Sequence, residues 1–185
     1  MIKVISIFGT GIGKLYSVKY KDDRVNPKEY DALELLYDRW TNPNWLSDFF
    51  TKFKEDYQGF YGKLNLKKIV PRSIDEADLL FETLEDLAES NELDKLFKPL
   101  TKDNDLNEDL TSRIKAYGGD DAPWLRLYAI KYNNTYVITG GGIKLTKTMN
   151  TREHLKAELT KLNIVKGFLE DGGEVGVFEI DQEDE

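Results

Sequence analysis

Two kinds of hydrophobic spacing divide this chain. Alternating apolar and polar residues, typical of strands with one buried face, occupy its start and much of its second half. Apolar residues three and four positions apart, typical of one helix face, fill the middle and return near the end. The predicted strands are residues 2–8, 15–20, 124–132, 135–139, 143–148 and a short edge strand at 175–180. The predicted helices are residues 30–40, 43–53, 73–87 and 151–169.

Local signals indicate where several of these elements begin or end. Asn42-Pro43 predicts a helix start, with Asn as the N-cap and Pro in the first helical position. Ser73 and Glu76 have the spacing of a capping box, which predicts that the third helix opens there. Residues 98–123 are polar and are predicted to form a loop.

The order of elements predicts an α+β fold: an antiparallel β-sheet with a C-terminal helix packed on it and a large inserted helical block. We expect a single domain over residues 1–185. Its expected parts are a sheet core at 1–22 and 124–148, a helical insertion at about 28–110, the C-terminal helix at 151–169 and an acidic tail at 181–185.

Composition excludes several classes of protein. Apolar residues make up 40% of the chain and aromatic residues 12%, enough for a core and against wholesale disorder. The chain has no Cys and only one His, which excludes thiolate and His-rich metal sites. We therefore expect no metal and no cofactor. No stretch resembles a signal peptide or a membrane-spanning helix, so we expect a cytoplasmic protein without membrane association.

Charge is unevenly distributed along the chain. The net charge of −8 argues against a generally basic nucleic-acid binder. Residues 111–166, however, hold ten Lys and Arg against four Asp and Glu, which predicts a local anion-binding surface. Residues 167–185 hold eight acidic residues and no basic one. This acidic end either covers the basic surface as a weak mimic of nucleic acid or serves only as a solubilising tail.

Two glycine clusters have the composition of phosphate-binding loops. The first precedes Lys14, but Phe8 and Leu15 stand where a P-loop needs Gly and Ser or Thr. A strand pattern follows it where a dinucleotide site needs a helix, so we interpret this cluster as a hairpin turn. The second cluster, residues 140–142, either lets a phosphate approach bare backbone amides or forms a hairpin loop or bulge.

Polar side chains that share a strand face are the main candidates for a functional site. Arg126, Tyr128 and Tyr132 share one face by alternation, and Lys144, Thr146 and Thr148 share another. Together they could hold an RNA phosphate and stack a base. The alternative is an ordinary solvated sheet face. The single histidine, His154, is interpreted as exposed and inert, with a role as general acid as the alternative.

The same strands resemble a known family. The chain carries LRLY at 125–128, TYVI at 135–138 and GGIKLTKT at 141–148, followed by a predicted helix. This arrangement resembles the C-terminal half of RelE/ParE-superfamily bacterial toxins, especially the HigB and phage-protein-like branch. The resemblance covers about residues 96–165 and includes an apolar-Pro-Leu segment at 96–100. Matching positions are Lys144, Thr146, Lys147, Thr148 and Glu153.

The resemblance implies a toxin of a bacterial toxin–antitoxin module that acts in stress responses. Such a protein cleaves messenger RNA on the ribosome without a metal and is neutralised by a small helix-turn-helix antitoxin. Implied catalytic residues are Arg126 and Lys144 as phosphate clamps, Lys147 as an assisting cation and Tyr128 as a stacking or proton-transfer group. Implied RNA-binding residues are Tyr132, Thr146, Thr148 and Arg152.

A second hypothesis comes from another class of protein. The helical block is acidic and rich in aromatic residues, so the chain could be a non-catalytic interaction protein, a phage-related or mobile-element accessory whose helical surface binds a protein partner. A toxin-like fold that has lost its activity is a further alternative.

Overall fold

The computed structural model describes residues 2–6, 15–20, 30–100, 111–118, 123–132, 135–146, 152–171 and 179–180. Helices and strands alternate in blocks along these ranges. In chain order the elements are β1 (Ile2–Ser6), β2 (Leu15–Tyr20), α1 (Ala32–Trp40), α2 (Pro43–Lys52), α3 (Lys54–Tyr61), α4 (Leu66–Glu89), the 3-10 helix η1 (Leu93–Lys95), β3 (Lys98–Pro99), β4 (Thr111–Tyr117), β5 (Leu125–Tyr132), β6 (Thr135–Ile143), α5 (Glu153–Glu170) and β7 (Glu179–Ile180).

The strands form one mixed sheet in the order β3-β4-β5-β6-β2-β1-β7. The α+β fold predicted from the sequence is confirmed, but the prediction of a purely antiparallel sheet is wrong. Strand β2 runs parallel to β6, while the other neighbours are antiparallel. Parallel neighbours need a long crossover, and here the helical block and three further strands (β3, β4 and β5) separate β2 from β6 in sequence.

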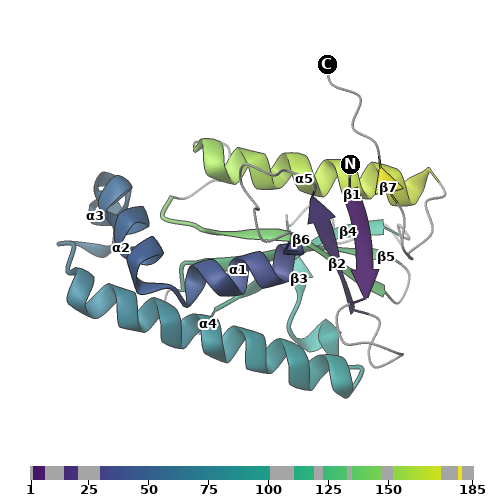
Figure 1. Cartoon of the computed structure of the whole chain (residues 1–185), viewed down its shortest axis with the longest axis horizontal. Coiled ribbons are helices and arrows are strands. Elements are labelled where there is room, and N and C mark those ends of the chain that lie inside the picture. The colour runs from purple at the N-terminus through teal and green to yellow at the C-terminus, as the bar shows by residue number, and fades with distance from the viewer. Residues whose placement is uncertain are drawn as a thin grey trace.

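Helices cover both faces of the sheet. Figure 1 shows α5 along one side of the sheet and α1 and α4 along the other. The larger apolar cluster joins α1–α4 to sheet residues such as Leu125, Leu127 and Ile138. The smaller one joins α5 residues such as Leu162 to sheet residues such as Tyr128 and Val137. Because both faces are covered, the central strands leave little sheet surface for a ligand.

Capping residues set the starts of the first two helices, as their chemistry requires. Asp31 accepts hydrogen bonds from the amides of Leu33 and Glu34, and Glu34 returns the bond in a capping box. Asn42 caps α2 with Pro43 in the first turn, which confirms that prediction. The predicted second helix in fact ends at Lys52, and a separate α3 follows Phe53.

The predicted start of the third helix is wrong. Helix α4 begins at Leu66, so Ser73 lies inside it, fully buried, instead of capping it. The Ser73 hydroxyl donates to the carbonyl oxygen of Ile69 (2.9 Å) and accepts from the indole Nε1 of Trp124 (3.0 Å). The spacing of Ser73 and Glu76 resembles a capping box, but the serine is there to accept a hydrogen bond from the buried indole N–H.

The segment predicted as a loop at 98–123 contains two strands. Within it lie β3 and the seven-residue β4, which pairs with β5 from Thr111↔Tyr132 to Tyr117↔Arg126. Ile114 and Ala116 of β4 are buried against the helical block. With only these two apolar side chains, β4 has too weak an alternation to stand out among polar neighbours.

The glycines at 140–142 lie inside a strand. Strand β6 runs continuously from Thr135 to Ile143, and its register with β5 shifts between Tyr128 and Ala129. Residues 144–146 are not strand, so the separate strand predicted at 143–148 is wrong over its described part. Of the two structural alternatives for the glycines, the register shift supports a bulge.

Other predicted elements are confirmed. Strand pairing confirms the β1–β2 hairpin, the β5–β6 pair and the end of the short edge strand, seen as β7. The predicted C-terminal helix is α5. Several predicted features lie outside the described residues: the glycine turn at 9–13, the turn at 133–134 and the acidic tail at 181–185.

Candidate nucleic-acid interface

Cationic side chains gather around the ring of Tyr117, where β4 ends. Arg126 lies opposite Tyr117 in the β4–β5 pair, with its Cζ 4.1 Å from the ring centroid. Lys98 and Lys115 lie opposite each other in the β3–β4 pair, with their Nζ atoms 5.7 and 5.8 Å from the same centroid. Lys144 directly follows the end of β6, and the nearby positive charges of Arg126 and Lys115 lower its pKa. We call these residues the basic cluster: Lys98, Lys115, Tyr117, Arg126 and Lys144.

Strand alternation places the cluster on one face. Ile114, Ala116 and Leu125 belong to the core under the helical block, so Lys115, Tyr117 and Arg126 point to the opposite face. All but the exposed Lys98 are half-buried. The charged groups therefore lie close together, partly shielded from solvent, where β4 ends and β5 begins.

The electrostatics of the cluster favour an anion. Burial lowers the pKa of the Arg126 guanidinium. Burial also lowers the pKa of the Lys144 ammonium, and the charges of Arg126 and Lys115 lower it further. Both shifts mean that the positive charge is disfavoured where it stands. A bound anion would relieve this cost.

Within the described residues, the cluster cations form no ion pair with a carboxylate. Lys115 donates to the carbonyl oxygen of Leu100 (2.9 Å), and Arg126 donates to that of Leu125 (2.8 Å). Other cations of the basic segment 111–166 do have acidic partners: Lys131 with Asp94, Arg152 with Asp56, Lys156 with Glu153 and Lys161 with Glu158. Arg113 bonds instead to the amide oxygen of Asn163 (3.0 Å). What distinguishes the cluster is that four cations without a described ion pair lie close together around one aromatic ring.

Of the residues predicted from the sequence, Arg126 and Lys144 are brought together. Thr146, half-buried, follows Lys144 by two residues. Lys147 and Thr148 lie outside the described residues. Sequence reasoning missed Lys98, Lys115 and Tyr117, because their segment was predicted to be a loop. The alternation of Lys115 and Tyr117 with buried residues was the signal that could have found them.

Tyr128 does not reach the cluster surface. Its side chain is 1% exposed and packs under α5 with Ile130 and Val137. Burial raises the pKa of its phenol, and the hydroxyl has no hydrogen-bond partner among described groups. In this position the ring cannot stack on a base from solution. Tyr117 offers an aromatic ring at the place where Tyr128 was expected to act.

Tyr132 and Arg152 lie elsewhere. Tyr132 ends β5, six residues beyond Arg126, a separation of about 20 Å along a strand. Arg152 precedes α5 and binds both carboxylate oxygens of Asp56 in α3. These hydrogen bonds lower the pKa of the Asp56 carboxyl and raise that of the Arg152 guanidinium. Arg152 therefore ties α5 to the helical block.

The second glycine cluster is occupied by a protein carboxylate. A Cβ at Gly140, whose φ is +155°, would lie 2.1 Å from Oε2 of Glu158 on α5. On the other face, a Cβ at Gly141 would lie 2.7 Å from the Arg126 carbonyl oxygen and 2.8 Å from Leu36. The glycines thus allow α1 and α5 to approach β6 closely. This packing role, and not an approach by phosphate, accounts for them.

His154 is half-buried, which corrects the expectation of an exposed side chain. Its ring lies 4.6 Å from that of Phe53 and 5.5 Å from that of Phe49. Burial lowers its pKa, and its Nε2 lies 3.4 Å from the Ile143 carbonyl oxygen. We interpret His154 as a packing residue between α5 and the helical block.

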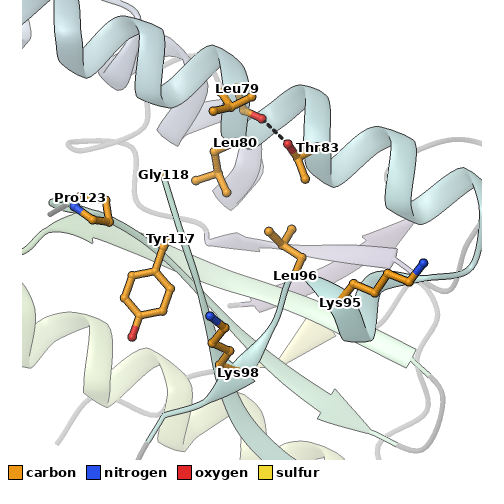
Figure 2. A pocket seen from close by; sticks show the side chains of 9 residues that line it. All are labelled: Leu79, Leu80, Thr83, Lys95, Leu96, Lys98, Tyr117, Gly118 and Pro123. Atoms are coloured by element: carbon orange, nitrogen blue, oxygen red, sulfur yellow. Dashed lines mark hydrogen bonds between the residues drawn. The ribbon is translucent and has the colours of Figure 1, made fainter. Parts of the chain in front are cut away.

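A pocket of about 490 Å³ lies next to the basic cluster. Figure 2 shows α4 above it, contributing Leu79, Leu80 and Thr83, with Leu96 and the cluster residues Lys98 and Tyr117 below. Leu80 and Leu96 extend into the space between α4 and the strands. The pocket lies on the α4 side of the sheet and most cluster side chains lie on the other, so a single ligand would contact both by passing around the β3–β4 edge, where Lys98 and Tyr117 belong to both.

The described ranges contain no group of three or more His, Asp or Glu residues that could hold a metal ion. No described helix is long and apolar enough to cross a membrane.

Comparison of the chain with protein-family models, curated proteins and solved structures finds no match. The resemblance to RelE/ParE toxins therefore depends on the residues themselves and stays a prediction.

Proposed function

We propose that the protein binds single-stranded RNA through the basic cluster, as the toxin of a bacterial toxin–antitoxin module. The observation that carries this proposal is the concentration of cations around Tyr117 without a described carboxylate partner. Phosphates would neutralise Lys98, Lys115 and Lys144. Single-stranded RNA also presents unstacked bases, which pair well with aromatic rings and guanidinium planes.

The reaction we propose is metal-independent cleavage of the RNA backbone. The ribose 2′ oxygen attacks the adjacent phosphorus, and the bond from phosphorus to the 5′ oxygen breaks. The products are a 2′,3′-cyclic phosphate and a 5′-hydroxyl end. Arg126 stabilises the charge on the phosphate. Lys144, as an ammonium, stabilises the same charge, while water accepts the 2′-hydroxyl proton and protonates the departing 5′ oxygen.

In the cell, this activity would act in the cytoplasm on messenger RNA at the ribosome. A small helix-turn-helix antitoxin would neutralise it by covering the basic cluster.

The test combines Arg126→Ala with Lys144→Ala and measures binding of a short fluorescein-labelled single-stranded RNA by anisotropy. We expect at least about a tenfold loss of affinity, because two phosphate contacts disappear. The matched control combines Lys67→Ala with Lys68→Ala, two exposed cations of α4, and removes the same charge. Equal affinities for the two double variants would contradict the proposal, as would wild-type protein that binds no RNA.

Cleavage and toxicity are read out separately. Inducible expression of the wild-type chain should arrest growth, and the Arg126→Ala, Lys144→Ala variant should relieve the arrest. RNA incubated with the pure protein should gain 2′,3′-cyclic phosphate ends. If the protein binds RNA but neither cleaves it nor arrests growth, the proposed RNA binding is supported and the proposed toxin activity is contradicted.

The interaction-protein hypothesis is favoured by a different surface. Tyr37, Phe60 and Leu79 in the helical block are each about half exposed, at 51%, 52% and 55%. Helix α4, which carries Leu79, also exposes six acidic residues: Asp75, Asp78, Glu82, Glu85, Asp86 and Glu89. Harmless expression together with absent RNA binding would favour this second function.

A further inference from the structure

The pocket beside the basic cluster is a second feature of the site, and binding phosphate on the cluster would not fill it. Its volume of about 490 Å³ lies in the range typical of small-molecule sites. Leu79, Leu80 and Leu96 give it apolar walls, while Lys98 and Tyr117 form the border with the cluster. An occupant should therefore be largely uncharged, and joined to an anionic group outside the pocket.

Charge fixes the orientation of such an occupant. Asp78 and Glu82 are exposed on α4 next to the pocket residues of that helix and would repel a phosphate. On the opposite side, Lys98 and Arg126 would attract one, whereas Lys95, which also lines the pocket, is paired with Glu92. The anionic part therefore lies toward β4, and the uncharged part lies toward α4.

On the α4 side, the Thr83 hydroxyl can form a hydrogen bond with an uncharged ring. The Thr83 hydroxyl donates to the Leu79 carbonyl oxygen (2.7 Å), as the dashed line in Figure 2 shows. Its oxygen keeps lone pairs that can accept a hydrogen bond from an exocyclic amino group.

We propose that this pocket receives one nucleobase of a single-stranded RNA whose flanking phosphates lie on the basic cluster. This inference rests on the proposed RNA binding and adds to it a base-specific site, built by the inserted helical block and not by the sheet. The protein would thus hold one base out of the stack while the cluster grips the backbone.

The test fills the pocket and compares two polyanions. Thr83→Phe places a ring in the pocket, and Thr51→Phe on the exposed face of α2 is the matched control. The probes are a fluorescein-labelled single-stranded RNA and inorganic polyphosphate, which has the charge but no bases. We expect Thr83→Phe to weaken RNA binding about tenfold, since a stacked base contributes about that much. Polyphosphate binding should stay unchanged.

Cross-linking gives a second measurement that needs no substitution. RNA that contains 4-thiouridine, irradiated with the wild-type protein, should cross-link within α4 or at Leu96 and Tyr117. Leu79→Ser, at an exposed position that tolerates polarity, is a milder pocket variant should Thr83→Phe fail to fold.

The two proposals fail in different ways. If Arg126→Ala with Lys144→Ala weakens both probes while Thr83→Phe and Leu79→Ser weaken neither, the base pocket is overturned and RNA binding stands. Cross-links confined to residues outside the pocket also overturn it. If the wild-type protein binds neither probe, the proposed function fails and the base pocket fails with it. Equal weakening of RNA and polyphosphate by Thr83→Phe shows a change in the cluster and overturns the base-specific role.

Discussion

At the scale of single residues, the glycines of β6 decide how closely the helices approach the sheet. Gly140 faces the Glu158 carboxylate of α5, whereas Gly141 faces α1 and the neighbouring strand. Neither position has room for a methyl group. Their place beside Arg126, which pairs with Gly142, makes the position of the basic cluster depend on this packing.

We predict that Gly140→Ala destabilises the protein by about 1–3 kcal/mol, the usual cost of overpacking. The new Cβ would lie 2.1 Å from Glu158 Oε2, and the φ of +155° is unfavourable for alanine. The matched control is Gly167→Ala in α5, where nothing lies within 4 Å of the Cβ; it should stabilise by about 0.5–1 kcal/mol. Denaturant unfolding measures both, and equal stabilities would contradict the role of Gly140.

At the scale of elements, Glu158 of α5 is a buried carboxyl group packed against Gly140 of β6. Its side chain is buried, with Oε1 accepting from Lys161 Nζ (2.7 Å) and Oε2 without a described partner. Burial raises its pKa, although Lys161, Arg39 and the Gly141 amide act in the opposite direction. The folded protein therefore binds this proton more tightly than the unfolded chain does.

We predict that Glu158→Gln becomes more stabilising, relative to wild type, as pH rises. The wild-type protein loses stability as pH rises from about 4.3, the pKa of an unfolded-chain Glu, through the higher folded pKa. Glutamine does not titrate, so the difference in unfolding free energy should grow over this window and then level off. Each tenfold tightening of the proton in the folded state adds about 1.4 kcal/mol.

Asp56→Asn is the control of opposite sign. Hydrogen bonds from Arg152 lower the pKa of Asp56, so its stabilising effect is present at neutral pH and is lost as pH falls. The advantage of wild type over Asp56→Asn should therefore shrink in acid. Parallel pH profiles for the two variants would contradict the assigned environments.

The sequence predicted elements well where the apolar spacing was strong or a cap was clear. Helices α1 and α5 and the β1–β2 and β5–β6 pairs follow from such patterns. Tertiary context decided the rest. Ser73 bonds to Trp124 instead of capping a helix, and β4 has only Ile114 and Ala116 to reveal a buried face.

The same limit explains how much of the candidate site was predicted. Arg126 was named because its strand was recognised. Lys144 was named from a strand predicted at 143–148 that is wrong over its described part, but it directly follows β6 and so still lies near Arg126. Lys98, Lys115 and Tyr117 come from a segment whose pairing depends on residues far along the chain, which local spacing does not encode. Tyr128 shares a face with Arg126, but that face is covered by α5, and alternation says nothing about what covers a face.

At the scale of the whole molecule, a net charge of −8 coexists with a compact basic cluster. Helices cover both sheet faces, and the cluster lies where β4 ends and β5 begins. RNA must therefore overcome a general repulsion to reach a local attraction. Salt screens the two effects unequally, because distant charges are screened more than those in contact.

We predict that RNA affinity falls steeply with salt even though the protein is acidic. Up to four cations contacting phosphates of a single strand give a slope of log affinity against log salt of roughly −3. Removing two of them with Arg126→Ala and Lys144→Ala should make the slope shallower by about 1. The Lys67→Ala, Lys68→Ala control lies outside the contact and should keep the wild-type slope. Anisotropy titrations between about 50 and 200 mM salt measure all three slopes. Because the slope counts released counterions and not overall charge, equal slopes for the cluster variant and the wild type would place the RNA somewhere other than around Tyr117.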